Sequence, residues 1–341
     1  MKSLRIHILF VLCVIFCLIS CNDMAYKKSP IDYVDINIGD TGHFSRPAYP
    51  VVHLPGGMLK IYPKLSESTS DTIPGLPVAV TGHRGNSSFT ISPVSCKSSI
   101  SEIVKKYTYD NEIICPYRYS VYLNREKVRV DYALSYRSGI YNVVFEDGDL
   151  NRLIISAGEG NLEFNGVGVT GQRLIDDGLC MVYIYMEAEQ QVKNAGSLKT
   201  NVINYSRSAV EGGDEALVLD FSAKHINIRY GISFVNTEQA RENLRKEINT
   251  YSVDDIAKTG RATWNEALGK IEVRDGDEDD KTALYTSLYR VYASRVNMLE
   301  DGRWSGNEDC RFNGDEWISI LSSIGFDPAK LVLVMGNKVK E

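Results

Sequence analysis

The sequence predicts a mainly β fold in which an N-terminal antiparallel β-sandwich is followed by helices. Three observations predict it. Short segments rich in Val, Ile and Tyr recur between residues 91 and 235, many of them alternate in polarity, and turn signals separate them at the intervals of a sandwich or barrel. Beyond Asn236 the apolar residues recur at helical spacing instead. The chain therefore has two unlike regions that meet near this residue.

The strand candidates combine β-branched or aromatic residues with a period of two, as half-buried strands do. They are Tyr119–Asn124, Val128–Leu134, Tyr141–Phe145, Met181–Glu187 and Leu217–Phe221. Gly- and Asp-rich turn signals such as Gly212-Gly213-Asp214 lie between them, which favours antiparallel neighbours.

Two helices are expected directly after the strands. Thr237 is a candidate cap for the first, with Glu238 in its first turn. Ser252 and Asp255 fit a capping box for the second, which runs toward Leu268. Both have the character of a linker between two larger units.

A third helix is expected over Asp280–Val296. Its apolar residues form one stripe at spacings of three and four: Ala283, Leu284, Leu288, Val291 and Tyr292. Such a stripe needs partners, and few candidate elements follow it. We therefore expect residues beyond Asp280 to be poorly packed.

The N-terminus has the pattern of a signal peptide. Lys2 and Arg5 precede the apolar run Ile8–Ile19, which is shorter than the roughly 20 residues of a membrane-spanning helix. Leu18-Ile19-Ser20-Cys21 resembles the lipobox of bacterial lipoproteins, which implies lipidation of Cys21. We expect anchoring to the bacterial cell envelope, facing the periplasm or on the outer-membrane surface. An ordinary secretory signal that happens to contain cysteines is the alternative.

Charge and cysteine content exclude several classes of function. The full chain has a net charge of −6, and loss of Lys2 and Arg5 with the signal makes it more negative, which argues against nucleic acid as a partner. The cysteines after the anchor are widely spaced, with no CxxC and no Cys/His cluster. They are Cys96, Cys115, Cys180 and Cys310. Neither a disulfide framework nor a zinc site is indicated, and buried hydrophobic positions are the simplest interpretation.

Two motifs have structural interpretations. Gly166–Gly171 matches GxGxxG, but no crossover helix follows it, so strand and turn glycines are favoured over a dinucleotide loop. The acidic pairs lie at turns or near helix starts, where Asp caps exposed N–H groups. They are Asp176-Asp177, Asp254-Asp255 and Asp279-Asp280. None qualifies as an acid/base pair.

The loop histidines leave two interpretations open. His43 and His53 lie in segments dense in Gly and Pro, and His83-Arg84 lies in another loop. Such side chains can hydrogen-bond sugar hydroxyls beside an aromatic surface. They can equally hold loops together by bonding backbone carbonyls. Together they are candidates for the edge of a pocket.

Several stretches, in order and spacing, resemble glycoside hydrolase family 92, the exo-acting α-mannosidases. At the start these are Asp32–Gly39 and Leu54–Met58, at the boundary Ser233–Val235, Gln239–Leu244, Glu247-Ile248, Trp264-Asn265 and Leu268–Val273, and beyond it Leu284–Arg290 and Glu300–Arg303. The similarity covers about residues 31–306. No single motif is specific, whereas their order is.

The resemblance implies a galactose-mutarotase-like supersandwich, a helical linker and an (α/α)6 toroid with a calcium-dependent inverting site. On this basis the expected units are a signal peptide at 1–20, a tether at 21–31, the β-sandwich at 32–235, the linker at 236–272 and a truncated start of the catalytic toroid at 273–341. The catalytic carboxylates and calcium ligands of the family would fall beyond Glu341. Residues Asn307–Glu341 also depart from the family pattern, either through a frameshift or premature stop or as a diverged tail.

The expected function is that of a family 92 α-mannosidase fragment in mannoside degradation, inactive as it stands, with mannose-containing glycans as partners. The alternative is a non-catalytic carbohydrate-binding surface lipoprotein. No residue inherits a catalytic or metal role, and no calcium is expected in this fragment. The candidate residues of a sugar-pocket wall are His43, Arg46, His83, Arg84, Asp301, Arg303 and Trp304.

Overall fold

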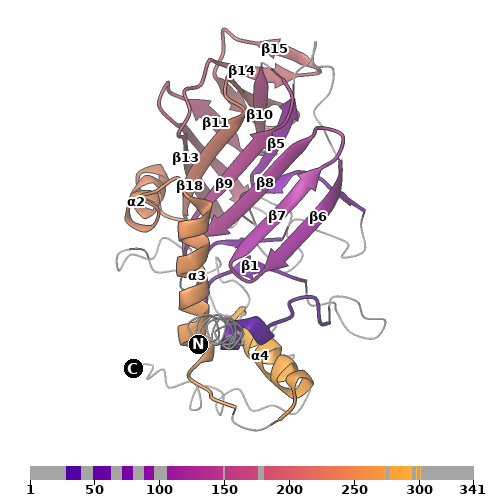
Figure 1. The fold of residues 1–341 in the computed structure, drawn as a ribbon. Helices are drawn as coiled ribbons and strands as arrows, with labels where there is room; N and C mark the ends of the chain where they lie inside the picture. Colours follow the sequence, from indigo (N-terminus) through magenta and orange to yellow (C-terminus); the bar gives the residue numbers. More distant parts are fainter. Residues whose placement is uncertain are drawn as a thin grey trace, which may run out of the picture.

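The computed structural model describes residues 28–39, 49–62, 71–79, 88–95, 106–148, 150–175, 180–273 and 276–293, together with Asn297 and Glu300. Among these residues, a pair of large antiparallel sheets pack face to face, and three α-helices follow them in the chain (Figure 1). The predicted mainly β fold, a sandwich followed by helices, is confirmed.

The larger sheet has ten strands in the order β16, β11, β12, β13, β18, β9, β8, β7, β6, β3. Its strands are β3 Thr72–Ile73, β6 Tyr107–Cys115, β7 Arg118–Leu123, β8 Val128–Leu134, β9 Ser138–Phe145, β11 Asn161–Phe164, β12 Val169–Ile175, β13 Cys180–Ala188, β16 Ala209–Glu211 and β18 His225–Ser233. Its described pairings are antiparallel, and most neighbours follow each other in the chain.

The second sheet has six strands in the order β15, β14, β17, β10, β5, β4. These are β4 Leu76–Pro77, β5 Thr90–Ser95, β10 Asn151–Ser156, β14 Asn194–Lys199, β15 Val202–Asn204 and β17 Ala216–Phe221. A separate two-stranded sheet pairs β1 Val52–His53 with β2 Lys60–Ile61. A short 3-10 helix, η1, spans Pro30–Tyr33.

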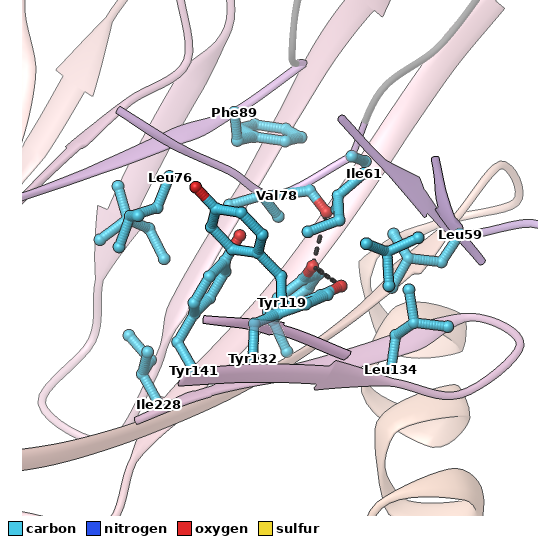
Figure 2. Close-up of a cluster of buried hydrophobic side chains, with 14 of the residues drawn as sticks. Leu59, Ile61, Leu76, Val78, Phe89, Tyr119, Tyr132, Leu134, Tyr141 and Ile228 are labelled. Carbon is cyan, nitrogen blue, oxygen red and sulfur yellow. Dashed lines mark hydrogen bonds between the residues drawn. The ribbon is translucent and has the colours of Figure 1, made fainter. Parts of the chain in front are cut away.

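Buried tyrosines occupy the core between the sheets. Tyr132, Tyr141 and Tyr230 are fully buried, and their hydroxyls would be costly there without partners. Tyr230 donates to the Val78 carbonyl at 2.6 Å and lies 2.8 Å from the Tyr132 hydroxyl, while Tyr141 donates to the Pro77 carbonyl. Figure 2 shows Tyr132 and Tyr141 in this core beneath Val78 and Phe89. The tyrosine hydroxyls of the core therefore hold residues 77–78, which precede β5, by hydrogen bonds as well as by apolar contact.

Helix α2 spans Thr237–Glu247, so the change from strand to helix comes where the sequence predicts it. The cap is Asn236 rather than Thr237. The Asn236 side chain accepts a hydrogen bond from the Gln239 N–H at 2.8 Å, and Asn236 itself is in extended backbone, as a cap residue should be. The predicted position was wrong by one residue because both residue types can cap a helix.

Helix α3 spans Val253–Leu268 and begins as predicted, since the Ser252 side chain accepts from the Asp255 N–H. Together α2 and α3 cover one end of the outer face of the ten-stranded sheet with a small apolar cluster of their own. Gly231 in β18 permits the close approach. A Cβ there would lie 2.2 Å from the Ala240 carbonyl oxygen of α2.

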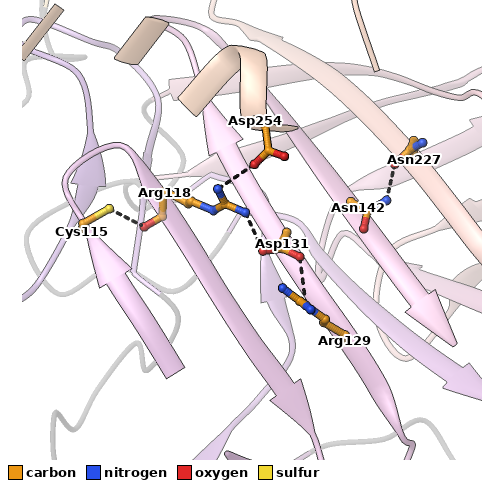
Figure 3. Close-up of polar contacts among 7 residues, drawn as sticks. All are labelled: Cys115, Arg118, Arg129, Asp131, Asn142, Asn227 and Asp254. Atoms are coloured by element: carbon orange, nitrogen blue, oxygen red, sulfur yellow. Dashed lines mark hydrogen bonds and ion pairs between the residues drawn. The ribbon is translucent and has the colours of Figure 1, made fainter. Parts of the chain in front are cut away.

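Ion pairs bind the start of α3 to the sheet. The Arg118 guanidinium of β7 donates to Asp254 in the first turn of α3 at 2.7 Å and to Asp131 of β8 at 3.0 Å (Figure 3). Arg129 is the second cation beside Asp131. Asp254 thus has a structural role, as expected for an acidic residue near a helix start.

Helix α4 spans Glu278–Ala293, close to the predicted Asp280–Val296. It buries Tyr285 and Tyr289, which are 4% and 0% exposed, whereas Leu284 on the predicted apolar stripe is 36% exposed. The expectation that this segment packs poorly is therefore wrong for the tyrosine face and correct for Leu284. The tyrosines find their partners in the N-terminal segment, which sequence spacing alone does not reveal.

The glycines of the GxGxxG match lie in the turn between β11 and β12 and in β12 itself. Gly166 has φ +91°, which favours glycine, and the Asn165 side chain accepts from the Gly168 N–H within the turn. The strand-and-turn interpretation holds. Among the helices that the structure describes, none is long and apolar enough to cross a membrane.

Candidate functional site

The N-terminal segment joins the helices to the sandwich. Asp32 in η1 accepts from Arg261 of α3 at 2.7 Å, and the Asn265 side chain of α3 accepts from the Ile31 N–H at 3.1 Å. From α4, the Thr286 hydroxyl accepts from the Asp35 N–H at 3.0 Å. Figure 1 shows this indigo segment beside α3 and α4. Residues more than two hundred positions apart are thereby fixed together.

Arg290 of α4 holds both sides of the segment that contains His43 and Arg46. Its guanidinium donates to the backbone carbonyls of Ile36 at 2.5 Å, Ile38 at 3.1 Å and Tyr49 at 2.7 Å. A planar guanidinium has five donors in a fixed fork, which suits three carbonyls at once. The described residues that flank this loop are therefore fixed against α4.

The β1–β2 sheet lies against α3 and α4. The Trp264 indole of α3 donates to the His53 carbonyl at 2.8 Å, and the Lys60 ammonium donates to the Ala293 carbonyl at the end of α4. Tyr289 of α4 donates to the Val51 carbonyl, and the Asn297 N–H donates to the Gly56 carbonyl. Helix α4 is thus packed on the N-terminal segment that precedes the sandwich.

The described residues on either side of His83 and Arg84 come together near the same end. The N–H of Ser88 donates to the Ala79 carbonyl at 2.7 Å, so the described residues on either side of the loop meet. The neighbouring Val78 carbonyl accepts from Tyr230, and a Cβ at Gly139 would lie 2.6 Å from the Tyr230 hydroxyl. Gly139 adjoins the turn between β8 and β9, so the base of the loop lies beneath that turn.

Glu300, which directly precedes the candidate residues Asp301, Arg303 and Trp304 in the sequence, is held in place by hydrogen bonds. It is 2% exposed, and its carboxylate accepts from the Phe234 N–H at 2.8 Å and from the Asn243 amide of α2 at 2.7 Å. The same amide donates to the Ile232 carbonyl at 2.9 Å. Glu300 thus binds where β18 ends and α2 begins. Asp301 follows it directly in the sequence.

These contacts place the described residues that border the candidate wall residues in the sequence at one end of the sandwich, which we call the joint end. It consists of residues 49–62, 78–79, 135–139 and 232–236 with α4, Glu300 and Trp264 of α3. Leu59 donates its N–H to the Tyr136 carbonyl at 2.8 Å, which joins β2 to the β8–β9 turn, and Ile232 donates to the Arg137 carbonyl at 2.9 Å, which joins that turn to β18.

The predicted pocket-wall side chains and the anchor themselves lie outside the described residues. They are Cys21, His43, Arg46, His83, Arg84, Asp301, Arg303 and Trp304. His53 is described, and it is 1% exposed inside β1, so it faces the interior rather than a pocket edge. Sequence reasoning missed Arg290 and Glu300 as organisers of the loop bases, because their acceptor and donor partners are distant backbone groups without any sequence signature.

Two carboxylates with little exposure lie at or beside the joint end, and both are engaged. Glu300 has its two amide donors, and Glu247 of α2 accepts from the Arg137 N–H at 2.7 Å and from its guanidinium at 3.3 Å. Burial raises the pKa of Glu247, although Arg137 opposes the shift. Within the described residues no three His, Cys, Asp or Glu side chains gather into a group that could hold a metal ion.

Comparison with known families and structures agrees with this architecture. Residues 33–233 match the glycosyl hydrolase family 92 N-terminal domain, and residues 239–318 match the glycosyl hydrolase family 92 catalytic domain. A curated relative, an uncharacterized secreted glycosidase of Arthroderma benhamiae, is 27% identical over 88 residues, which are 24% of this chain and 11% of that protein.

Solved structures share the fold. A family GH92 α-mannosidase from Bacteroides thetaiotaomicron has a TM-score of 0.69 at 20% identity, over 80% of this chain and 42% of that one. A family GH92 inverting mannosidase from the same organism has a TM-score of 0.69 at 21% identity, over 79% and 40%. The chain thus spans less than half the length of these structures. Because a family model matches more than half of its residues, this chain belongs to glycosyl hydrolase family 92.

Proposed function

We propose that this chain serves the degradation of mannosides as the sugar-facing scaffold of a family 92 α-mannosidase. The observation that carries the proposal is the convergence, at the joint end and next to α4, of the described residues that border the candidate wall residues in the sequence. The first of the two Bacteroides thetaiotaomicron α-mannosidases has also been solved in complex with mannoimidazole, which supports a mannose-like ligand for this fold. The wall residues would be those at 43, 46, 83, 84, 301, 303 and 304.

We infer that the described residues do not supply the catalytic pair. Inverting hydrolysis needs one carboxylic acid at the leaving oxygen and a second carboxylate to activate water, with the two groups about 6.5–9.5 Å apart. Glu247 and Glu300 are each held by structural donors and are poor candidates for either role. We propose in addition that purified residues 22–341 do not hydrolyse α-linked mannobiose. Turnover above that of a blank would refute this inference.

Binding distinguishes the scaffold from the alternative, a non-catalytic carbohydrate-binding surface lipoprotein. The experiment is calorimetric titration of residues 22–341 with mannose oligosaccharides. Saturable binding without turnover favours the binding module, and binding should then weaken in His83→Ala and Arg84→Ala. His225→Ala is the matched control, because His225 is an exposed histidine at the far end of β18. An absence of binding favours a scaffold that needs further residues to form the pocket.

We propose that residues 22–341 bind no calcium tightly. Calcium takes six to eight oxygen ligands, usually with carboxylates among them, and no three His, Cys, Asp or Glu side chains gather among the described residues. Calorimetric titration with calcium alone tests the proposal. Saturable binding at micromolar calcium would contradict it and would place the donors outside the described residues.

We propose that Cys21 is lipidated and tethers the protein to the cell envelope. The support is the sequence pattern of residues 2–21, since a lipidated cysteine as the new N-terminus gives attachment without a spanning helix. Cys21→Ser should move the protein from the membrane fraction to the soluble fraction, and mass spectrometry of the mature N-terminus should detect the loss of the acyl groups. Cys17→Ser is the control and should leave both unchanged.

A further inference from the structure

His53 is a buried histidine with one unpartnered ring nitrogen. Its Nδ1 lies 3.0 Å from the Leu54 carbonyl oxygen, and since a carbonyl only accepts, Nδ1 carries the proton. Nε2 is therefore the unprotonated nitrogen, and within the described residues it has no hydrogen-bond partner. The residue is 1% exposed. A proton added at Nε2 would create a buried donor for which the described residues provide no acceptor.

His53 lies where three elements meet. The Trp264 ring of α3 packs edge-on against the imidazole with centroids 5.1 Å apart, and the Tyr289 ring of α4 stacks on it at 5.2 Å. The His53 carbonyl accepts from the Trp264 indole, and its N–H donates to the Pro116 carbonyl at 2.9 Å. A change in the charge of the imidazole therefore alters the packing of β1 against α4 directly.

The surroundings of His53 are cationic. Lys60 is its cross-strand partner in β2, so both side chains project from the same face of the two-stranded sheet. Lys60 and Arg290 are the two charges that act on the imidazole, both are positive, and no described carboxylate opposes them. The other titratable groups packed nearby are neutral through pH 3 to 8, because burial raises the pKa of each. These are Tyr289 of α4, and Cys115 and Tyr117 where β6 turns into β7.

We propose that His53 makes the packing of α4 on the sandwich sensitive to acid: protonation of Nε2 places an unpaired donor and a third positive charge in the contact, and α4 is released. The device lies outside the proposed sugar pocket and does not depend on any glycosidase activity. It goes beyond the proposed function, because it concerns when the joint end holds together rather than what it binds.

The sign and size of the effect follow from linkage. Burial, reinforced by Lys60 and Arg290, lowers the pKa of His53 from 6.5 to about 3 in the packed state. With α4 released the imidazole meets water and returns toward its ordinary pKa. Between these two values the released state binds the extra proton, so the contribution of His53 to packing is complete above pH 6.5 and is lost as the pH falls. The opening equilibrium should rise about tenfold for each pH unit, or about 100-fold over two pH units below the ordinary pKa.

Hydrogen exchange of residues 278–293, read by mass spectrometry in purified residues 22–341, tests the proposal. Exchange is corrected for the intrinsic pH dependence of the amide rates, and the opening equilibrium is compared between roughly pH 7.5 and pH 4, which bracket most of the window. In the unmodified chain it should rise as stated. His53→Gln, which keeps a polar side chain without titrating, should make it flat. His225→Gln is the control and should leave the rise unchanged.

Lys60→Met supplies a second, graded variant. Without the neighbouring cation the imidazole protonates more easily in the packed state, so the rise should level off at a higher pH. The proposal is overturned if opening of α4 is independent of pH in the unmodified chain, or if His53→Gln shows the same rise.

A measurement on the unmodified chain keeps the proposal decidable even if His53→Gln does not fold. An NMR titration of the ring resonances should show His53 protonating well below its ordinary pKa of 6.5, together with loss of the contact shifts of Tyr289. Protonation of His53 near that ordinary value with those shifts retained would refute the proposal.

Discussion

The interior of the sandwich and the joint end are held together in different ways. In the sandwich, antiparallel strands bury a continuous apolar core, from Leu153 and Phe221 on one sheet to Tyr132 and Tyr141 on the other. At the joint end, side chains of α3 and α4 bind backbone groups of residues 31–60, which are more than two hundred positions away. The sandwich is therefore stabilised mainly by distributed apolar burial, and the joint end depends on individual polar contacts.

The difference predicts how each region fails. Apolar burial is distributed over many contacts, each contributing a little, so one altered hydroxyl should weaken the sandwich only slightly. At the joint end a few side chains such as Trp264 and Arg290 each serve several partners. Substitution of such a side chain should therefore destabilise the joint end strongly, with its main effect near the substituted residue. Single substitutions test this contrast, from the largest expected effect to the smallest.

Trp264→Ala should have the largest effect. The indole is fully buried, packs against the rings of His53, Tyr289 and Tyr292, and donates to the His53 carbonyl. Truncating a buried aromatic side chain costs about 3–5 kcal/mol. Urea unfolding measures the loss, and Trp264→Phe, which keeps a ring, should lose less.

The urea unfolding curve of Trp264→Ala also tests whether the sandwich and the joint end unfold separately. If the joint end unfolds separately from the sandwich, Trp264→Ala should split one transition into two, with helix lost first by circular dichroism. A single transition shifted as a whole would show instead that the two regions fold as one cooperative unit, and the contrast would then be one of contacts only.

Arg290→Met should have the second largest effect. It leaves the carbonyls of Ile36, Ile38 and Tyr49 without their guanidinium donor, and hydrogen bonds to charged groups contribute about 1.5–3 kcal/mol. Hydrogen exchange should increase in residues 28–39 and 49–62 and stay unchanged in β8 and β9. Arg129→Met is a matched control, because that side chain is 64% exposed and its ion pair with Asp131 is at the surface. Equal loosening of β8 would contradict the local nature of the contact.

The sequence predicts the first region far better than the second. Strand periodicity places the predicted strands of the sandwich to within a few residues, as for β8 over Val128–Leu134. The reason is that successive side chains of a strand face the core and the solvent in turn, so apolar and polar residues alternate. The buried face of α4 was not predictable. Tyr285 and Tyr289 bury against the N-terminal segment while Leu284 stays exposed, and no spacing rule encodes a partner so distant in the chain.

The candidate site has the same limit. Sequence composition points to residues 43, 46, 83 and 84, and the family resemblance points to residues 301, 303 and 304. The structure shows what fixes the described residues that border them. The fixing residues, Arg290 and Glu300, act through backbone partners. A backbone carbonyl or N–H is present at almost every position, so the sequence does not show which of these groups will take part in such a contact.

Tyr230→Phe tests the sandwich and should have a smaller effect. The change removes the hydroxyl that donates to the Val78 carbonyl and meets the Tyr132 hydroxyl, while the buried ring remains. We expect a loss of about 1 kcal/mol in the free energy of unfolding, the typical net value of one hydrogen bond. A double-mutant cycle with Tyr132→Phe measures the coupling of the two hydroxyls. A loss as large as that of Trp264→Ala would erase the contrast between the two regions.

Leu284→Ala should have the smallest effect of all. Leu284 is 36% exposed, unlike the buried tyrosines of α4, and substitutions at exposed positions away from specific contacts usually change stability by no more than about 0.5 kcal/mol. Urea unfolding of Leu284→Ala should therefore overlay that of the unmodified chain. Leu153→Ala is the matched control, because the same truncation at a fully buried position costs about 2–5 kcal/mol. If the two variants lost similar stability, Leu284 would have to be covered in solution, and more than the tyrosine face of α4 would then be packed.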